Sequence, residues 1–344
     1  MVSTSKASVS ERPAARMLDL IVGYWVSCGV HVAARLGLAD QLSSGPRNVE
    51  ELAGATSTHA PNLYRLLRML AASGVFRERA DGSFENTPLS ETLRSDAGDS
   101  MRGFAVMMLD GHNAMAWNDL LASIRTGAAA FRRVHGQEIF EYLAARPEKA
   151  REFGESMTSL SRTENPAIAG AYDFSGIRTL VDVGGGHGSL LAEILRKAPG
   201  LRGVVYDRPE VIEAAMRAVH LRESGIAERC ELVAGSFFES VPEGDAYIMK
   251  YILHDWDDEQ CERILSNCRR ASGGKAKVLV VDTVVPPGND PHWSKLLDVN
   301  MLVLTSGRER SRDEFAQLLA RAGWRLQRVV PTACPLSIVE AVAA

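Results

Sequence analysis

The chain has 344 residues, of which 46% are hydrophobic and 24% are charged. Domains usually hold about 100 to 200 residues, so this length predicts two globular domains and excludes a small disulfide-stapled protein. The 39 Lys and Arg residues do not outnumber the 43 Asp and Glu residues, which argues against a protein that binds nucleic acid through a basic surface.

The five cysteines include no C-x-x-C pair, so they predict neither a disulfide framework nor a thiolate metal site, and they favour a reducing compartment. Residues 1–11 lack the apolar stretch of a secretory signal, and no unbroken run of 18 apolar residues occurs. We therefore expect a cytoplasmic protein that neither crosses nor enters a membrane.

The N-terminal part combines helical and hairpin patterns. We expect a disordered tail over residues 1–10. Residues 12–42 then place apolar and small residues at helical spacing. Positions 13–34 carry only two charges, Arg16 and Asp19, so another protein surface is expected to cover this helix. A further helix starts at Pro61, and two short strands follow around Asp81-Gly82. Helix, turn, helix and hairpin in this order are typical of a winged helix.

Winged helices often bind DNA, but the charge of this segment argues against that function. From Glu11 to Ser95 there are nine arginines, nine acidic residues and no lysine. Neutralising phosphate groups needs an excess of positive charge, which is absent here. We expect residues 11–100 to be a winged-helix domain that pairs with a second copy in a homodimer. Residues 101–171 are helical and rich in methionine, and are expected to form a linker and part of a substrate pocket.

From residue 172 onward, apolar runs typical of β-strands alternate with helical stretches. The expected strands are residues 179–183, 202–206, 231–234, 246–249 and 277–282, followed by 324–330 and 336–342. Strands separated by helices indicate a parallel sheet buried on both faces, and the last two runs, with no helix between them, indicate an antiparallel hairpin. We therefore predict an α/β fold with a Rossmann-like domain over residues 172–344.

The first of these strands leads into a glycine-rich loop, Asp182-Val183-Gly184-Gly185-Gly186-His187-Gly188-Ser189. Glycines allow a ligand to approach the backbone, and the following helix N-terminus offers free amides, so the loop predicts a cofactor site. A phosphate-binding loop would end in Gly-Lys-Ser or Gly-Lys-Thr, which is absent here. A dinucleotide site would have glycine or alanine at Ser189, so that alternative is weakened but stays open. The spacing Asp-x-Gly-x-Gly-x-Gly, with Asp207 after the second strand to hold a ribose, fits better.

This arrangement resembles the glycine-rich loop of class I S-adenosylmethionine-dependent methyltransferases. Residues 235–239 (Gly-Ser-Phe-Phe-Glu) and 249–258, which contain Leu-His-Asp-Trp, are similar to segments of small-molecule O-methyltransferases. A third block, Gly307-Arg308-Glu309-Arg310-Ser311, also matches that family. The resemblance covers nearly the whole chain and is to the caffeate-type enzymes of plants and the antibiotic-pathway enzymes of bacteria.

The resemblance implies S-adenosylmethionine as the cofactor. The residues implied to bind it are Asp182, Gly184, Gly186, Gly188, Asp207, Ser236, Phe237 and Lys250. The three glycines would curve around the methionyl part, Asp207 would accept both ribose hydroxyls, and Phe237 would pack on the adenine. Lys250 would lie near the nucleoside. Ser236 stands where the family usually has an aspartate, so it offers the adenine amine a weaker, uncharged acceptor.

The acceptor needs a base, because a phenol has a pKa of about 10 and keeps its proton at neutral pH. Among eight histidines, His254 alone follows the end of an expected strand of this sheet, where open α/β folds bind ligands. We therefore predict His254 as the general base. The resemblance implies that Asp282 and Glu309 orient it, while the adjacent Asp255 either assists or caps the next helix.

The resemblance also implies that Met157, Met301 and Thr305 line a pocket for a flat, hydroxylated aromatic acceptor, with Asp255 among the pocket residues. No cluster at metal-ligand spacing occurs, which predicts a metal-independent enzyme. We predict an S-adenosylmethionine-dependent O-methyltransferase acting on a phenolic or enolic hydroxyl of an aromatic secondary metabolite. Two alternatives are a non-methylating reaction on the same fold and cofactor, which the retained His254 disfavours, and a winged-helix transcription regulator, which the charge disfavours.

Overall fold

The computed structural model describes residues 12–344, and the tail expected at residues 1–10 lies outside this range. Two compact units divide the chain. The N-terminal unit holds the residues up to Gly111 together with Glu155–Leu160, and the sheet unit holds His112–Gly154 and Ser161–Ala344.

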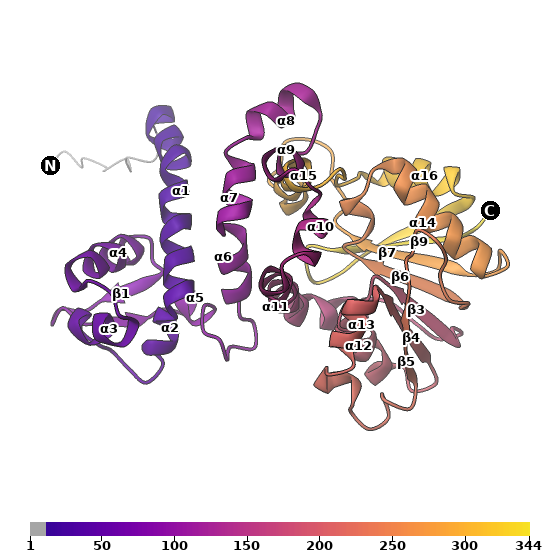
Figure 1. Ribbon diagram of the computed structural model, residues 1–344, viewed down its shortest axis with the longest axis horizontal. Helices are drawn as coiled ribbons and strands as arrows, with labels where there is room; N and C mark the ends of the chain where they lie inside the picture. Colours follow the sequence, from indigo (N-terminus) through magenta and orange to yellow (C-terminus); the bar gives the residue numbers. More distant parts are fainter. Residues whose placement is uncertain (1–11) are drawn as a thin grey trace, which may run out of the picture. The chain divides into compact units, whose positions relative to one another are not determined.

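The N-terminal unit is a group of helices with a two-stranded sheet (Figure 1). Its elements in chain order are α1 (Pro13–Leu36), α2 (Leu38–Gln41), α3 (Val49–Thr56), α4 (Ala60–Ala72), β1 (Phe76–Glu78), β2 (Phe84–Asn86), α5 (Pro88–Glu91) and α6 (Arg102–Met108). Gly37, with φ of +63°, ends α1, and a capping box of Asn48 and Glu51 begins α3. Strands β1 and β2 pair antiparallel across a turn at Gly82, which completes the winged-helix order that the sequence predicts.

Helix α1 leaves an apolar face uncovered within its own unit. Leu18, Ile21 and Trp25 are 57%, 65% and 64% exposed, whereas Ala33 and Ala34 are buried in the core of the unit. A continuous apolar face of this kind marks an interaction surface. In the described part of the chain, α1 is also the one helix that is long and apolar enough to span a membrane. Helices that are covered by protein meet the same criteria of length and composition.

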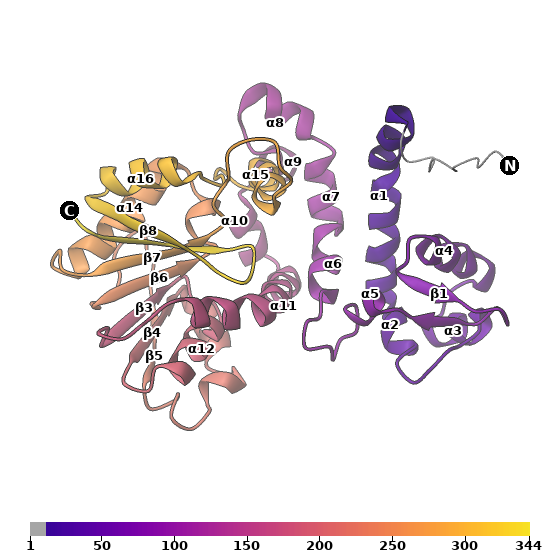
Figure 2. The same ribbon diagram turned by 180° about the vertical axis from the view of Figure 1, so that it is seen from behind.

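The sheet unit contains a set of helices before its first strand. They are α7 (Gly111–Trp117), α8 (Leu120–Thr126), α9 (Ala130–His135), α10 (Ile139–Ala144) and α11 (Pro147–Ala171), whose residues are divided between the two units. Residues 101–171, which the sequence analysis treats as one linker and pocket segment, are thus divided between the two units. The physical reason is a shared core, because Phe131 and Ile139 pack with Val303 and Leu304 from far along the chain, where α15 meets these helices (Figure 2).

Seven strands form the sheet, in the order β5-β4-β3-β6-β7-β9-β8. They are β3 (Thr179–Val183), β4 (Arg202–Asp207), β5 (Cys230–Ala234), β6 (Ala246–Lys250), β7 (Lys277–Asp282), β8 (Trp324–Pro331) and β9 (Ser337–Ala343). The first five in chain order pair in parallel, while β9 pairs antiparallel with both β7 and β8. The predicted α/β fold with a closing antiparallel hairpin is confirmed.

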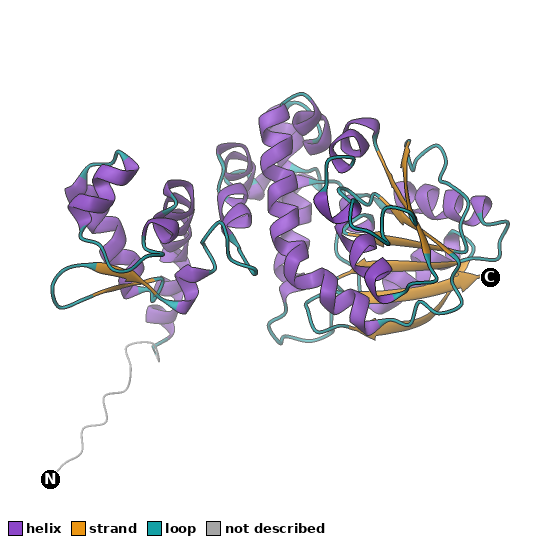
Figure 3. Ribbon diagram, turned by 90° about the horizontal axis from the view of Figure 1, so that it is seen from below, coloured by secondary structure: helices purple, strands orange, loops and turns teal. Residues whose placement is uncertain are grey.

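Helices cover both faces of this sheet (Figure 3). The remaining helices are α12 (Ser189–Lys197), α13 (Pro209–Ala215), η2 (Val219–Leu221), η3 (Leu253–Asp255), α14 (Asp258–Ala271), α15 (Trp293–Leu304) and α16 (Arg312–Arg321). Leu191 of α12 belongs to the core on one face, whereas Ile264 of α14 and Leu318 of α16 belong to the core on the other. Because the five parallel strands run in one direction, the loops after them lie along a single edge, where such folds bind ligands.

Candidate active site

The glycine loop after β3 turns sharply because three of its glycines adopt left-handed backbone conformations. The φ angle is +70° at Gly184, +57° at Gly186 and +74° at Gly188. A Cβ atom at Gly184 would lie 2.3 Å from Ile252 Cδ1, so no other residue fits there without displacing Ile252. A Cβ atom at Gly186 would meet no described atom within 4 Å. The backbone at Gly186 therefore borders open space.

Asp207 ends β4 directly beside this loop. Its Oδ2 accepts the N–H of Gly186 at 2.8 Å, and its Oδ1 accepts the N–H of Arg208 at 2.7 Å. Burial raises the pKa of Asp207, and the two N–H groups oppose that shift. Each carboxylate oxygen has a second lone pair, so Asp207 can hold the loop and still accept hydrogen bonds from a diol.

Asp182, in β3, is a buried carboxyl group with an unsatisfied oxygen. It is 2% exposed, and its Oδ2 has no hydrogen-bond partner among the described residues. Burial raises the pKa of Asp182 to about 7, although the charge of Lys250 opposes the shift. A buried carboxylate oxygen in this state is stabilised by a cationic ligand group such as an ammonium.

The loop after β5 brings an aromatic ring to the glycine loop. Phe237 Cε1 lies 3.7 Å from the place that a Cβ at Gly184 would occupy, and its ring contacts those of Phe238 and Trp256 edge to face. Ser236, directly before Phe237 in the chain, is half-buried. The ring of Phe237 therefore offers a flat apolar surface beside the glycine loop.

Lys250 ends β6, and its ammonium group contacts α11. Nζ donates to Ser161 Oγ at 2.7 Å and to Asn165 Oδ1 at 2.9 Å, and it pairs with Glu164 Oε2 at 3.2 Å. An ammonium group has three N–H donors, so these contacts occupy all of them. The resemblance places Lys250 near the nucleoside, whereas the structure brings its charge to α11.

His254 lies in η3, directly after β6, and is 7% exposed. Its Nδ1 lies 2.7 Å from Glu309 Oε1, a distance at which the Nδ1–H group donates a hydrogen bond to that carboxylate. The other ring nitrogen, Nε2, makes no hydrogen bond to the described residues and lies 3.6 Å from Asp255 Oδ1. The bond to Glu309 therefore selects the tautomer in which the neutral imidazole carries its lone pair on Nε2.

Three carboxyl groups make this imidazole more basic. Burial by itself opposes protonation of His254, but Asp255, Glu309 and Asp282 outweigh burial and raise its pKa. Burial also raises the pKa of Asp255 and that of Asp282, while the charge of His254 opposes both shifts. His254 is thus a stronger base than an isolated histidine, whose pKa is about 6.5.

Glu309 is held by two groups that the sequence alone does not single out. The hydroxyl group of Thr283 donates to Glu309 Oε2, and Asp298 Oδ1 accepts the N–H of Glu309 at 2.9 Å. Thr283 is fully buried, immediately after β7. A hydroxyl residue at the end of a buried parallel strand is the signal that could have identified Thr283.

Asp282 ends β7 and accepts a hydrogen bond from the backbone before His254. Its Oδ1 accepts the N–H of Tyr251 at 3.1 Å, and its Oδ2 has no partner in the described chain. The resemblance implies that Asp282 and Glu309 both orient the imidazole. In the structure, the imidazole donates its hydrogen bond to Glu309, while Asp282 acts on the imidazole through charge and through Tyr251.

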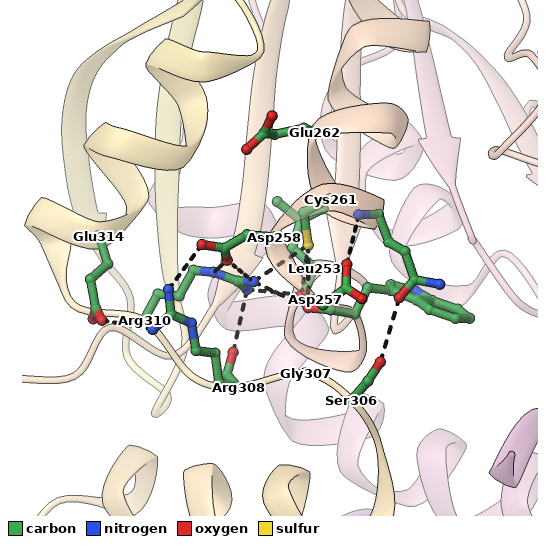
Figure 4. A network of polar contacts seen from close by, with 12 residues as sticks. Leu253, Asp257, Asp258, Cys261, Glu262, Ser306, Gly307, Arg308, Arg310 and Glu314 are labelled. Carbon is green, nitrogen blue, oxygen red and sulfur yellow. Dashed lines mark hydrogen bonds and ion pairs between the residues drawn. The ribbon is translucent and has the colours of Figure 1, made fainter. Parts of the chain in front are cut away.

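Arg310 is a buried guanidinium group that holds the segment around His254 (Figure 4). It donates to the carbonyl oxygen of Leu253 at 2.9 Å and to that of Trp256 at 3.1 Å, and it pairs with Asp258 at 2.8 Å. The planar fork of arginine suits such divided hydrogen bonding. These contacts fix the backbone on both sides of the imidazole, a role that the sequence does not reveal because the partners come from a distant segment.

The residues expected to line the acceptor pocket have different environments. Met301 in α15 and Thr305 at its C-terminal end are each 6% exposed. The Thr305 hydroxyl donates to the Met301 carbonyl at 3.1 Å and accepts the N–H of Gly307 at 3.1 Å, so it also caps the helix. Met157 lies on α11 among the residues of the N-terminal unit. Within residues 12–344 no group of three or more His, Cys, Asp or Glu side chains could hold a metal ion.

Two family models match the chain. The O-methyltransferase dimerisation domain matches residues 18–96, and the O-methyltransferase domain matches residues 117–325. This chain belongs to the S-adenosylmethionine-dependent O-methyltransferase family. The methyltransferase is 45% identical to the phenazine O-methyltransferase PhzM of Lysobacter antibioticus. The alignment spans 326 residues and covers 94% of this chain and 95% of that protein.

Other relatives support the same assignment. The methyltransferase is 40% identical to the mitomycin biosynthesis 6-O-methyltransferase of Streptomyces lavendulae, over 94% of this chain and 92% of that protein. A crystal structure of CalO1, a methyltransferase in calicheamicin biosynthesis, in its SAH-bound form also matches the fold. The two chains are 39% identical and superpose with a TM-score of 0.84, over 96% of this chain and 98% of that one. The predicted enzyme class and the predicted cofactor, S-adenosylmethionine, are confirmed.

Proposed function

We propose that this methyltransferase transfers the methyl group of S-adenosylmethionine to a phenolic or enolic hydroxyl of an aromatic secondary metabolite, with His254 as the general base. The observation that carries the proposal is the state of the imidazole. Its Nδ1 is bound to Glu309, while Nε2 has no hydrogen-bond partner in the described chain. A general base needs a nitrogen free to accept the proton and a second group that fixes its tautomer.

The residues around the glycine loop fit the cofactor. Open space at Gly186 suits its methionyl part, and the unsatisfied oxygen of Asp182 suits its ammonium group. Asp207 has lone pairs for the ribose hydroxyls, and the ring of Phe237 has a surface for the adenine, with the Ser236 hydroxyl nearby in sequence. When bound, S-adenosylmethionine supplies a methyl group activated by a positively charged sulfur.

The chemical task of the protein side chains is to remove one proton from the acceptor hydroxyl. Transfer forms a carbon–oxygen bond and breaks a carbon–sulfur bond, and the hydroxyl proton passes to His254 Nε2. A phenol has a pKa of about 10, so the raised pKa of His254 reduces the free-energy cost of that proton transfer. General base catalysis contributes about 10²- to 10⁴-fold, and alignment of the oxygen with the methyl group supplies the rest.

The aromatic nature of the acceptor has two supports. One relative is named for a phenazine, a fused aromatic ring system. In this chain, Trp256 lies two residues after His254, and Phe140 stacks on it with 5.5 Å between the ring centroids. We propose that Met301, Thr305 and Asp255 border the acceptor, since all three lie within the sheet unit and Asp255 is adjacent to the base.

We also propose that the enzyme acts in the cytoplasm as a homodimer. The exposed apolar face of α1 falls inside the segment that matches the dimerisation domain. Covering this face with a second copy would remove the apolar side chains of Ile21 and Trp25 from water. Light scattering should therefore give twice the mass of the chain, and Ile21→Glu with Trp25→Glu should give a monomer. A wild-type monomer at micromolar concentration would exclude the dimer.

A panel of matched acceptors tests the reaction. We would incubate the enzyme with S-adenosylmethionine carrying a labelled methyl group and with 1-hydroxyphenazine, 1-aminophenazine or 1-methoxyphenazine, and then extend the panel to hydroxybenzoates and hydroxynaphthoates. We expect label on oxygen in a hydroxylated aromatic and none in the methoxy compound. Label on nitrogen alone, or no binding of S-adenosylhomocysteine by calorimetry, would overturn the proposal.

A further inference from the structure

Tyr251 connects β6 to η3 in a strained backbone conformation. Its φ is +58°, and among the described residues only Ser57 and Tyr251 have a positive φ without being glycine. The left-handed conformation is unfavourable for a bulky side chain, because Cβ approaches the following carbonyl oxygen. Such strain persists only where surrounding contacts determine the conformation, and it is concentrated at functional sites.

The backbone and the hydroxyl group of Tyr251 are both fixed by neighbours. The N–H of Tyr251 donates to the carbonyl of Val281 and to Oδ1 of Asp282, each at 3.1 Å. At the other end of the side chain, the hydroxyl donates to Glu164 Oε1 at 2.7 Å, and the second oxygen of Glu164 pairs with Lys250. Burial raises the pKa of Tyr251, so the hydroxyl keeps its proton and acts as the donor.

The ring of Tyr251, held between these two ends, lies against the face of His254. The two ring centroids are 5.1 Å apart, and the ring planes differ by 25°. The hydrogen bond from Nδ1 to Glu309 holds the imidazole at one atom and still allows it to tilt about that bond. A flat surface against one face removes this tilt, and it therefore determines the direction in which Nε2 points.

We propose that Tyr251 is a positioning residue that sets the plane of the His254 imidazole, and that Glu164 and Lys250 anchor Tyr251 to α11. The proposal rests on the proposed function, in which His254 is the base. The same stretch of α11 reaches the cofactor loop, because Asn165 Nδ2 donates to Ser189 Oγ at 3.0 Å, directly after the last glycine. Helix α11 thus ties the base and the cofactor loop into one rigid arrangement.

Two substitutions separate the ring of Tyr251 from its hydroxyl group. Tyr251→Leu removes the flat surface, and we expect kcat to fall by about 100-fold, as a displacement of about 1 Å can cause. Tyr251→Phe keeps the surface but loses its anchor to Glu164, so we expect a smaller fall of about 10-fold. The KM for S-adenosylmethionine and the dissociation constant of S-adenosylhomocysteine should stay within about twofold, because the glycine loop is unchanged.

Tyr247→Phe is the matched control. Tyr247 lies on β6, is fully buried, and donates its hydroxyl to the carbonyl of Pro242 at 3.1 Å, with no contact to His254. The same loss of one buried hydroxyl should leave kcat unchanged. If Tyr247→Phe lowers kcat as much as Tyr251→Phe, the effect is general loss of packing and the positioning role is wrong.

A second set of measurements shows whether Tyr251 acts through His254. In a His254→Ala background, Tyr251→Leu should lower kcat by less than about twofold, because the ring has nothing left to position. Nuclear magnetic resonance of ¹³Cε1-labelled histidine, assigned with His254→Ala, needs no acceptor. We expect the His254 proton signal to lie upfield in the wild type and to move downfield in Tyr251→Leu, because the ring current is lost.

The outcomes distinguish the two proposals. If His254→Ala leaves methyl transfer unchanged, the base assignment fails, whatever Tyr251 does. If His254→Ala lowers transfer as expected but Tyr251→Leu is fully active, or the two losses multiply in the double variant, the positioning role alone fails. A His254 signal that Tyr251→Leu leaves unmoved would show that the rings are not stacked in solution, and it would also overturn the positioning role.

Discussion

The glycine loop and the segment around His254 follow neighbouring strands, β3 and β6, yet they are built differently. The loop contains its chemistry within consecutive residues 182–189, uses left-handed glycines, and leaves an oxygen of Asp182 without a partner. The imidazole of His254 instead depends on side chains from separate segments, and Glu309 uses both of its oxygens.

This difference indicates how each region should respond to change. A loop that borders open space is completed by its ligand, so substitutions there should act mainly on cofactor affinity. The proposed base, His254, is already held by protein groups before any ligand arrives, so substitutions there should act mainly on kcat. The following predictions test this division, beginning with the largest effect.

Replacing the base should give the largest loss of activity. We expect His254→Ala to lower methyl transfer at neutral pH by about 10²- to 10⁴-fold, because the acceptor would lose its general base. The affinity for S-adenosylhomocysteine, measured by calorimetry, should not change. His59→Ala, at an exposed position before α4, is the control and should retain full activity. An active His254→Ala enzyme would show that the acceptor ionises without help.

Glu309→Gln tests the orienting group by removing its charge while keeping its shape. We expect kcat to fall by about 10- to 100-fold, as is usual when a group that orients a functional histidine is lost. The carboxylate helps to raise the pKa of His254, so in the wild type the rising limb of kcat/KM against pH should lie above pH 6.5. In Glu309→Gln this limb should move to lower pH. A profile with the same midpoint in both proteins would contradict the electrostatic role.

Asp182→Asn tests whether the carboxylate of Asp182 binds the cofactor. The variant loses a charge-assisted contact of about 1.5 to 3 kcal/mol, so S-adenosylhomocysteine should bind roughly 10- to 100-fold more weakly. Because burial raises the pKa of Asp182 to about 7, wild-type affinity should increase as the pH rises through 7 and the carboxyl ionises. Calorimetry at pH 6 and pH 8 checks both points. If the affinity for S-adenosylhomocysteine rises equally with pH in Asp182→Asn, the pH effect comes from another group.

We expect the smallest effects when either of two glycines is replaced by alanine. The two variants should be equally destabilised but should differ in cofactor binding. Gly186 and Gly176 both have positive φ, +57° and +80°, and a Cβ atom at either would meet no described atom within 4 Å. Each change to alanine should lower the free energy of unfolding by about 1 to 2 kcal/mol. Only Gly186→Ala should weaken S-adenosylhomocysteine binding. Equal binding by both variants would show that the ligand does not use the space at Gly186.

Much of the fold could be predicted because its signals are local. Strands such as residues 179–183 and 277–282 appear where the apolar runs place them, since strands buried on both faces need continuous apolar sequence. The division of residues 101–171 between two units could not be predicted, because Phe131 and Ile139 share a core with α15, and no local pattern encodes that packing.

The candidate site shows the same limit in its details. His254 and Glu309 could be proposed from short motifs, but the contacts of Thr283 and Arg310 could not, because their partners lie 26 or more positions away in the chain. The strain at Tyr251 is likewise invisible in the sequence, since it comes from the contact of its N–H with Asp282 and of its hydroxyl with Glu164.

The sequence by itself determined the class of the fold and the cofactor loop, and it led us to propose His254 as the base, because each of these rests on consecutive residues whose spacing has a direct physical meaning. The tertiary structure decided which acid binds the imidazole, which side chains hold that acid, and how α11 is joined to both the base and the cofactor loop. These contacts join residues that are close only after folding, and their hydrogen bonds depend on distances of a few tenths of an ångström that no sequence pattern specifies.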